Sequence, residues 1–165
     1  MQPRLRKLAL TAHVSASVGW LGAVAGVLAL AIVGLASEDT QTVRAVYIAM
    51  EPIAWFVVLP LSLASLLTGL VQSLGTVWGL FRHYWVVAKL VINLVATVIL
   101  MLYMRTLGDL ADSASQPGVS TSDLRDPSPV LHAGVALVLL LTATTLAVYK
   151  PPGVTPYGRR RAARG

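Results

Sequence analysis

Two ionisable side chains fall inside apolar stretches of this 165-residue sequence, where a charge is costly and therefore suggests a function. His13 lies about five residues into the first stretch and Lys89 about five into the third, which places both roughly 7 to 8 Å below one membrane surface. An imidazole can ligate a metal, and an amine can pair with an anion. We therefore expect His13 and Lys89 to share one site.

Other polar residues are expected at the same depth. Ser17 lies one helical turn beyond His13, and Asn93 lies one turn beyond Lys89. The second and fourth stretches contribute Ser65, Thr68, Gln72, Thr142 and Thr145. An alternative stays open for each ionisable residue: Lys89 extends to the membrane surface along its own stem, or His13 only bonds to a neighbouring helix.

A second candidate site lies toward the opposite surface. His132 begins the fourth stretch near the expected depth of Glu51, so the two residues form a candidate pair or second metal site. The alternative is a solvated helix start. His13 and His132 differ in height by roughly 20 Å, whereas a haem is about 10 Å across, so they cannot ligate one haem iron. His83 adjoins Tyr84 and Trp85 and is interpreted as an interfacial anchor.

Four apolar stretches must position these residues: 8–36, 52–74, 84–104 and 129–149. Hydrophobic residues make up 56% of the chain and charged residues 12%, and the mean hydropathy is +0.72. A helix of roughly 20 apolar residues crosses a bilayer, so each stretch suffices. We predict an all-α protein, a four-helix transmembrane bundle over residues 1–150, followed by a basic tail over 151–165. The polar stretch 108–128 is predicted to be a flexible linker.

The distribution of charge predicts the orientation of the bundle. Nine Lys and Arg residues flank the helices on the side of the two termini and three flank them on the other, so both termini should be cytoplasmic. The nine are Arg4, Arg6, Lys7, Arg82, Lys150, Arg159, Arg160, Arg161 and Arg164, and the three are Arg44, Arg105 and Arg125. All seven acidic residues also fall on that other side.

Small residues and prolines predict how the helices pack. Ser15, Gly19, Gly22 and Gly26 form one face, which predicts close helix packing within the chain or, alternatively, a homodimer. Pro60 lies mid-stretch and should distort its helix. Pro52 suits the first turn of the same helix, with Glu51 at its N-terminus.

Several classes of chemistry lack any motif in the sequence. There is no cysteine, which excludes disulfides, thiolate metal sites and iron–sulfur clusters. There is also no GxxxxGK[ST], GxGxxG, HExxH or GxSxG pattern, so phosphoryl transfer, dinucleotide binding and the corresponding hydrolases have no support. The basic residues lie where helices leave the membrane, which does not indicate nucleic-acid binding.

Two helices together resemble known families. The first reads HVSASVGWLGAVAG from His13, and the third opens with YWVVAKLVINL from Tyr84. This pairing resembles the quinone-linked membrane protoporphyrinogen oxidases and the copper-resistance D membrane domain. The whole chain, with its VYKPPGVTPYGRR exit, resembles an uncharacterised family of small bacterial integral membrane proteins. The resemblance implies a b-type haem, with His13 and Lys89 at the matching positions and Trp20 and Trp85 beside them.

Our leading hypothesis is a multi-pass protein of the bacterial inner membrane that binds haem b near its cytoplasmic side. His13 would ligate the iron, while Lys89 would pair a propionate or an anionic substrate, or ligate the iron itself. Ser17 and Asn93 would complete the site, and a quinone or porphyrin-type molecule would be the partner of a membrane oxidoreductase. Two alternatives stay open: a copper-handling or transport module, and a structural subunit without a cofactor.

Overall fold

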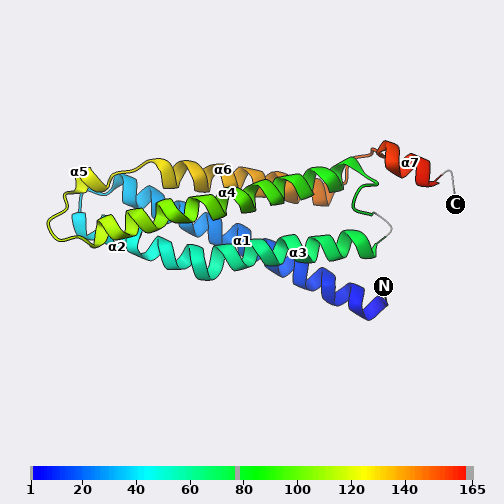
Figure 1. Ribbon diagram of the computed structural model, residues 1–165, viewed down its shortest axis with the longest axis horizontal. Coiled ribbons are helices and arrows are strands. Elements are labelled where there is room, and N and C mark those ends of the chain that lie inside the picture. The colour runs from blue at the N-terminus through cyan, green and yellow to red at the C-terminus, as the bar shows by residue number, and fades with distance from the viewer. Residues whose placement is uncertain (1, 77–78, 163–165) are drawn as a thin grey trace.

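The structure is a computed structural model that describes residues 2–76 and 79–162. Its helices are α1 (Pro3–Ala36), α2 (Thr40–Ile53), the π-helix η1 (Ala54–Val58), α3 (Leu59–Gly75), α4 (Tyr84–Ser115), α5 (Thr121–Leu124), α6 (Ser128–Tyr149) and α7 (Pro156–Ala162). They form one elongated bundle with both termini at the same end (Figure 1). No β-strand occurs in the described ranges. The all-α, four-helix prediction is therefore confirmed.

Four helical segments are long and apolar enough to cross a bilayer, the last of them made of α5 and α6 with a short break between them. They are Pro3–Ala36, Thr40–Gly75, Tyr84–Ser115 and Thr121–Tyr149. Large apolar side chains point outward along them: Phe56 is 81% exposed and Leu102 is 72% exposed. Such an exterior is unfavourable in water and favourable against lipid chains. These are the features of a multi-pass membrane protein.

The second membrane helix begins twelve residues earlier than predicted, because it starts at Thr40 rather than at Pro52. Asp39 caps this start, since its carboxylate accepts hydrogen bonds from the backbone N–H groups of Gln41 and Thr42. The hydroxyl of Thr42 also donates to this carboxylate, which lowers the pKa of Asp39. Pro52 therefore lies inside a helix, and its predicted place in the first turn is wrong. The early start buries a helical face made of Val43, Val46, Tyr47 and Met50.

The predicted distortion at Pro60 takes the form of a π-helical turn. In η1 the N–H of Leu59 donates to the carbonyl of Ala54, five residues earlier. Proline has no N–H group, so the carbonyl of Phe56 lacks the usual helical partner from Pro60. The chain widens just before this position and continues as α3. π-helical turns of this kind are frequent at functional sites.

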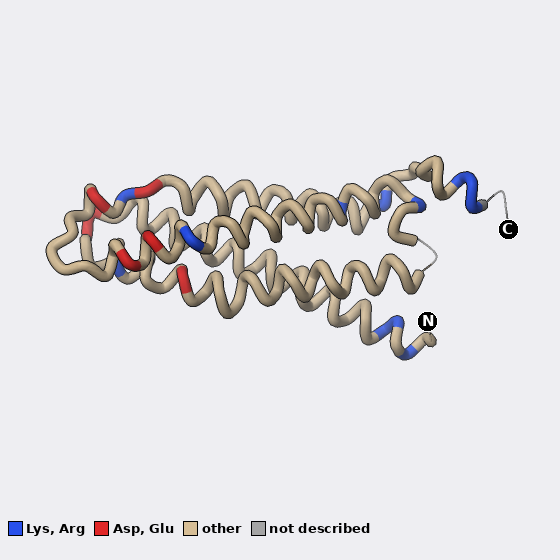
Figure 2. Tube along the Cα trace, viewed as in Figure 1, with Lys and Arg blue, Asp and Glu red and all other residues tan. Residues whose placement is uncertain are grey.

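The predicted linker over 108–128 is largely helical, which corrects that prediction. Helix α4 continues to Ser115 because Leu107, Ala111 and Ala114 recur on one face and are buried. Arg44 stabilises its last turn by donating from Nε to the carbonyl of Ala114 at 2.6 Å. The carboxylates gathered here belong to the end of the bundle away from the termini, where all seven acidic residues lie (Figure 2).

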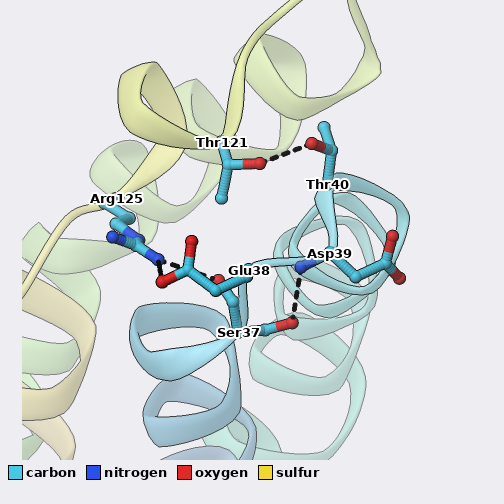
Figure 3. Close-up of polar contacts among 6 residues, drawn as sticks. All are labelled: Ser37, Glu38, Asp39, Thr40, Thr121 and Arg125. Carbon is cyan, nitrogen blue, oxygen red and sulfur yellow. Dashed lines mark hydrogen bonds and ion pairs between the residues drawn. The ribbon is translucent and has the colours of Figure 1, made fainter.

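Polar contacts close this acidic end of the bundle (Figure 3). Arg125 donates to Glu38 at 2.7 Å and to the carbonyl of Ser37 at 3.2 Å. The hydroxyls of Thr40 and Thr121 hydrogen-bond to each other. The segment that carries α5 is thereby held against the α1–α2 connection. The ion pair itself is exposed and contributes at most about 1 kcal/mol.

The small-residue face of α1 serves internal packing only in part. A Cβ atom on Gly19 would lie 3.3 Å from Leu61 Cδ1, so this glycine permits close packing on α3. Gly22 and Gly26 have nothing within 4 Å of that position, and Ser15 is exposed. A homodimer through this exposed part of the face stays a prediction.

Candidate functional site

The imidazole of His13 is held between α1 and α3. Its Nδ1 lies 3.1 Å from the backbone carbonyl of Ser65 and 3.1 Å from Thr68 Oγ1. The Thr68 hydroxyl in turn lies 2.5 Å from the carbonyl of Ala64, to which it donates. A carbonyl only accepts, so Nδ1 carries a proton and Nε2 keeps a lone pair in the neutral ring. A histidine that ligates a metal usually has this arrangement.

Helix α3 presents buried serines and a glycine on the face that contacts this imidazole. Ser62 and Ser65 are buried and lie three residues apart on the face toward α1. Ser65 Oγ hydrogen-bonds to Ser17 Oγ at 2.8 Å. Gly69 lies one turn further along, where a Cβ atom would be 3.1 Å from His13 Cε1. The absence of a side chain at Gly69 therefore makes room for the imidazole ring. The residues next to Gly69 in the sequence did not indicate this role.

Lys89 brings a positive charge from α4 to the same region. It lies close enough to His13 for the two side chains to interact electrostatically, and its Nζ is 5.8 Å from the Trp85 ring centroid. Its amine makes no hydrogen bond or ion pair with any residue that the structure describes. The carboxylates all lie at the far end of the bundle (Figure 2). The half-buried lysine therefore lacks a carboxylate counter-ion in the part of the chain that the structure describes.

More polar groups continue inward from this position. Asn93 is buried one turn beyond Lys89, and Thr97 is buried one turn beyond Asn93. Within the described ranges, Thr97 Oγ1 and Gln72 Nε2 are buried without a hydrogen-bond partner. Each such group costs free energy unless another molecule satisfies it. We name the set His13, Ser17, Ser65, Thr68, Lys89 and Asn93 the inner polar cluster.

Other predicted members lie outside this cluster. Trp20 is 2% exposed and packs in an apolar core with Val24, Val58 and Leu140, and its place in a cofactor site stays a prediction. Thr142 and Thr145 are exposed on α6, where their hydroxyls bond to carbonyls of their own helix. The inner polar cluster is therefore formed by α1, α3 and α4, and the hydrogen bonds of Thr142 and Thr145 do not join them to it.

The structure does not join His132 to Glu51. No hydrogen bond or ion pair connects them within the part of the chain described, and there no group of three or more His, Asp or Glu residues could hold a metal ion. His132 instead stacks on Tyr103, with ring centroids 3.9 Å apart. Sequence reasoning missed Tyr103 and Ser128, which surround this histidine.

The basic tail docks onto the connection between α3 and α4. The N–H of Thr155 donates to the carbonyl of Arg82 at 2.9 Å, and its hydroxyl donates to the carbonyl of Phe81 at 2.5 Å. A Cβ atom on Gly158 would lie 2.6 Å from the Arg82 carbonyl oxygen, so only glycine fits there. This contact places the arginines of α7 beside the end of the bundle that carries the inner polar cluster (Figure 2).

The inner polar cluster offers one anchored imidazole, one cation and several neutral hydrogen-bonding groups inside an apolar bundle. This combination suits a molecule that is largely apolar and carries a negative charge, since such a molecule would supply the counter-ion that Lys89 lacks among the described residues. His13 can in addition supply a metal ligand through Nε2. Comparison of the chain with protein families, with curated proteins and with solved structures finds no match.

Proposed function

We propose that the inner polar cluster binds an anionic, largely apolar cofactor, and that this cofactor is haem b. The observation that supports the proposal is the position of Lys89, a half-buried cation without a carboxylate partner among the described residues, near an imidazole whose Nδ1 is anchored on a carbonyl. The sequence resemblance to the membrane protoporphyrinogen oxidases favours haem among such molecules.

Each residue has a distinct part in this proposal. The carbonyl of Ser65 fixes the orientation of His13, whose Nε2 would ligate the iron. Lys89 would pair with a propionate, and Asn93 would donate a hydrogen bond one turn deeper. When bound, the cofactor supplies one-electron chemistry, for which a quinone dissolved in the membrane is the partner that we propose.

The donor groups fit a haem better than the space around them does. His13 lines neither of the two cavities described here, one in the other half of the bundle and one beside α7. A haem is about 10 Å across, so its binding beside His13 requires α1 to separate from α3, the helix that holds the imidazole. His13 is only half-buried, so it does not belong to the fully buried core of the bundle.

Haemin titration of the detergent-purified protein tests the role of Lys89. Lys89→Met should weaken haemin binding about tenfold, because a charge-assisted contact contributes roughly 1.5 kcal/mol or more. Lys89→Arg keeps the charge and should bind within about threefold of the wild-type protein. The far-ultraviolet circular dichroism of both variants controls for folding. Equal affinity of Lys89→Met and wild type would contradict the proposed contact.

The two alternative functions have weaker support. A copper-handling module needs several ligands at one place, and the described residues provide no such group. If the protein is a structural subunit without a cofactor, the half-buried position of Lys89 has no function. The lysine side chain would then extend along its stem to the membrane surface. Neither alternative has an observation that favours it over the haem proposal.

We also propose that both termini are cytoplasmic and that the membrane is the bacterial inner membrane. The termini share one end of the bundle (Figure 1), and nine basic residues flank the helices there against three at the other end. Arg164, one of the nine, lies outside the described residues. A membrane-impermeant maleimide added to intact cells should label a cysteine placed at Ser115 and spare one placed at Gln2. The reverse labelling pattern would overturn this orientation.

A further inference from the structure

A cavity lies in the half of the bundle away from the termini, and we name it the outer cavity. Its volume is about 310 Å³. The walls come from α1, η1, α4 and α6 and include Val24, Val27, Ala54, Val58, Leu100 and Ala136. An apolar cavity of about 150 Å³ can hold benzene, so the outer cavity has room for a ring and a short chain.

One end of the outer cavity is polar and has a defined hydrogen-bonding pattern. His132 and Tyr103 both line it and stack with an interplanar angle of 16°. The Nδ1 of His132 lies 2.8 Å from the carbonyl of Ser128, so Nδ1 carries a proton. The hydroxyl of Tyr103 is paired with Ser128 Oγ at 2.8 Å. In the neutral ring, Nε2 of His132 is therefore an acceptor, and no described residue donates to it.

The outer cavity is accessible from the lipid side. Three of its lining residues, Ile99 on α4 and Leu131 and Val135 on α6, are 42%, 63% and 49% exposed. Because these two helices cross the apolar layer, a molecule dissolved in the bilayer can reach the cavity between them. On another side the π-helical turn contributes Ala54 and Val58 to the wall, and such turns recur at binding sites.

We infer that the outer cavity binds an uncharged, apolar phenol or alcohol from the bilayer, whose hydroxyl donates a hydrogen bond to Nε2 of His132. Among the described residues no charged side chain lines the cavity, which disfavours ions. A pure hydrocarbon would leave Nε2 without a partner, at a cost in free energy. A ketone or an ether offers only acceptors and cannot supply the missing donor. The inference does not depend on haem binding at the inner polar cluster.

A matched pair of probes tests this inference. The first probe is a 4-alkylphenol that carries a trifluoromethyl group on its chain, and the second is its methyl ether, which lacks the O–H donor. Each is titrated into protein-containing nanodiscs and followed by fluorine NMR, with empty nanodiscs as the correction for partition into lipid. The phenol should bind saturably and about tenfold more tightly than the ether, as one hydrogen bond in an apolar site predicts.

Three variants locate the site. His132→Phe keeps an aromatic ring beside Tyr103 but removes Nε2, so it should reduce phenol binding to the level of the ether and leave ether binding unchanged. Ala136→Phe should fill the cavity and abolish binding of both probes. Leu102→Phe adds the same ring at a lipid-facing position and should change neither affinity. Equal binding of phenol and ether to the wild type, or no saturable binding of either, would overturn the inference. Both probes are colourless and iron-free, so this outcome is separate from that of the haem proposal.

Discussion

Replacing His13 with alanine is expected to abolish the Soret band of the haem-loaded protein or to shift it strongly. His13 is the only histidine in the inner polar cluster, and its Nδ1 is anchored on Ser65 so that Nε2 can ligate the iron. His132→Ala is the matched control, since that histidine lies in the other half of the bundle and should leave the band unchanged. Absorption spectra of equal protein concentrations measure both effects.

Chemical rescue separates ligation from a structural role of His13. His13→Gly leaves a gap of the size of the side chain, and free imidazole added to this variant should restore the Soret band. A histidine that only supports the helix packing would not be replaced by a small molecule in this way. An unchanged Soret band in His13→Ala would exclude His13 as the axial ligand.

Replacing Trp20 with alanine is expected to be among the most destabilising single substitutions in the bundle. Trp20 is 2% exposed and packs against Val24, Val58 and Leu140. Loss of a buried tryptophan costs about 3 kcal/mol or more, because the surrounding side chains cannot fill the cavity. Trp55 is 47% exposed to the lipid-facing side, so Trp55→Ala should cost much less.

Denaturation with sodium dodecyl sulfate in mixed micelles measures this difference in the free energy of unfolding. The comparison also tests the assignment of Trp20 to the apolar core rather than to the haem site. If Trp20→Ala left the stability unchanged but altered the haem spectrum, Trp20 would belong to the cofactor site, as the sequence resemblance implied.

The sequence predicts the membrane helices well but places their ends poorly. Hydropathy depends on composition over about 20 residues, which makes the four spans visible. The extensions are amphipathic, as in Thr40–Ile53 and the end of α4, where polar residues alternate with the buried Val43, Tyr47 and Leu107. Such segments look like loops on a hydropathy scale, and packing of their buried faces at the acidic end of the bundle helps to make them helical.

The two sites differ in how much of them the sequence could reveal. His13 and Lys89 are conspicuous because ionisable residues are rare inside apolar helices. The outer cavity has no such signal, since Tyr103 and His132 come from different helices and meet only when both helices have the correct rotation. The role of Gly69 was likewise not predicted, because it depends on the His13 imidazole, which occupies the space that a side chain at position 69 would need.

The absorption spectrum of the wild-type protein, purified in detergent from haem-replete cells, tests the central claim most directly. It should be recorded first for the oxidised protein and then after reduction with dithionite. Haem binding at the inner polar cluster predicts a Soret band that shifts on reduction, together with a sharp α-band typical of haem b. A colourless protein that also fails to bind added haemin would contradict the proposed function.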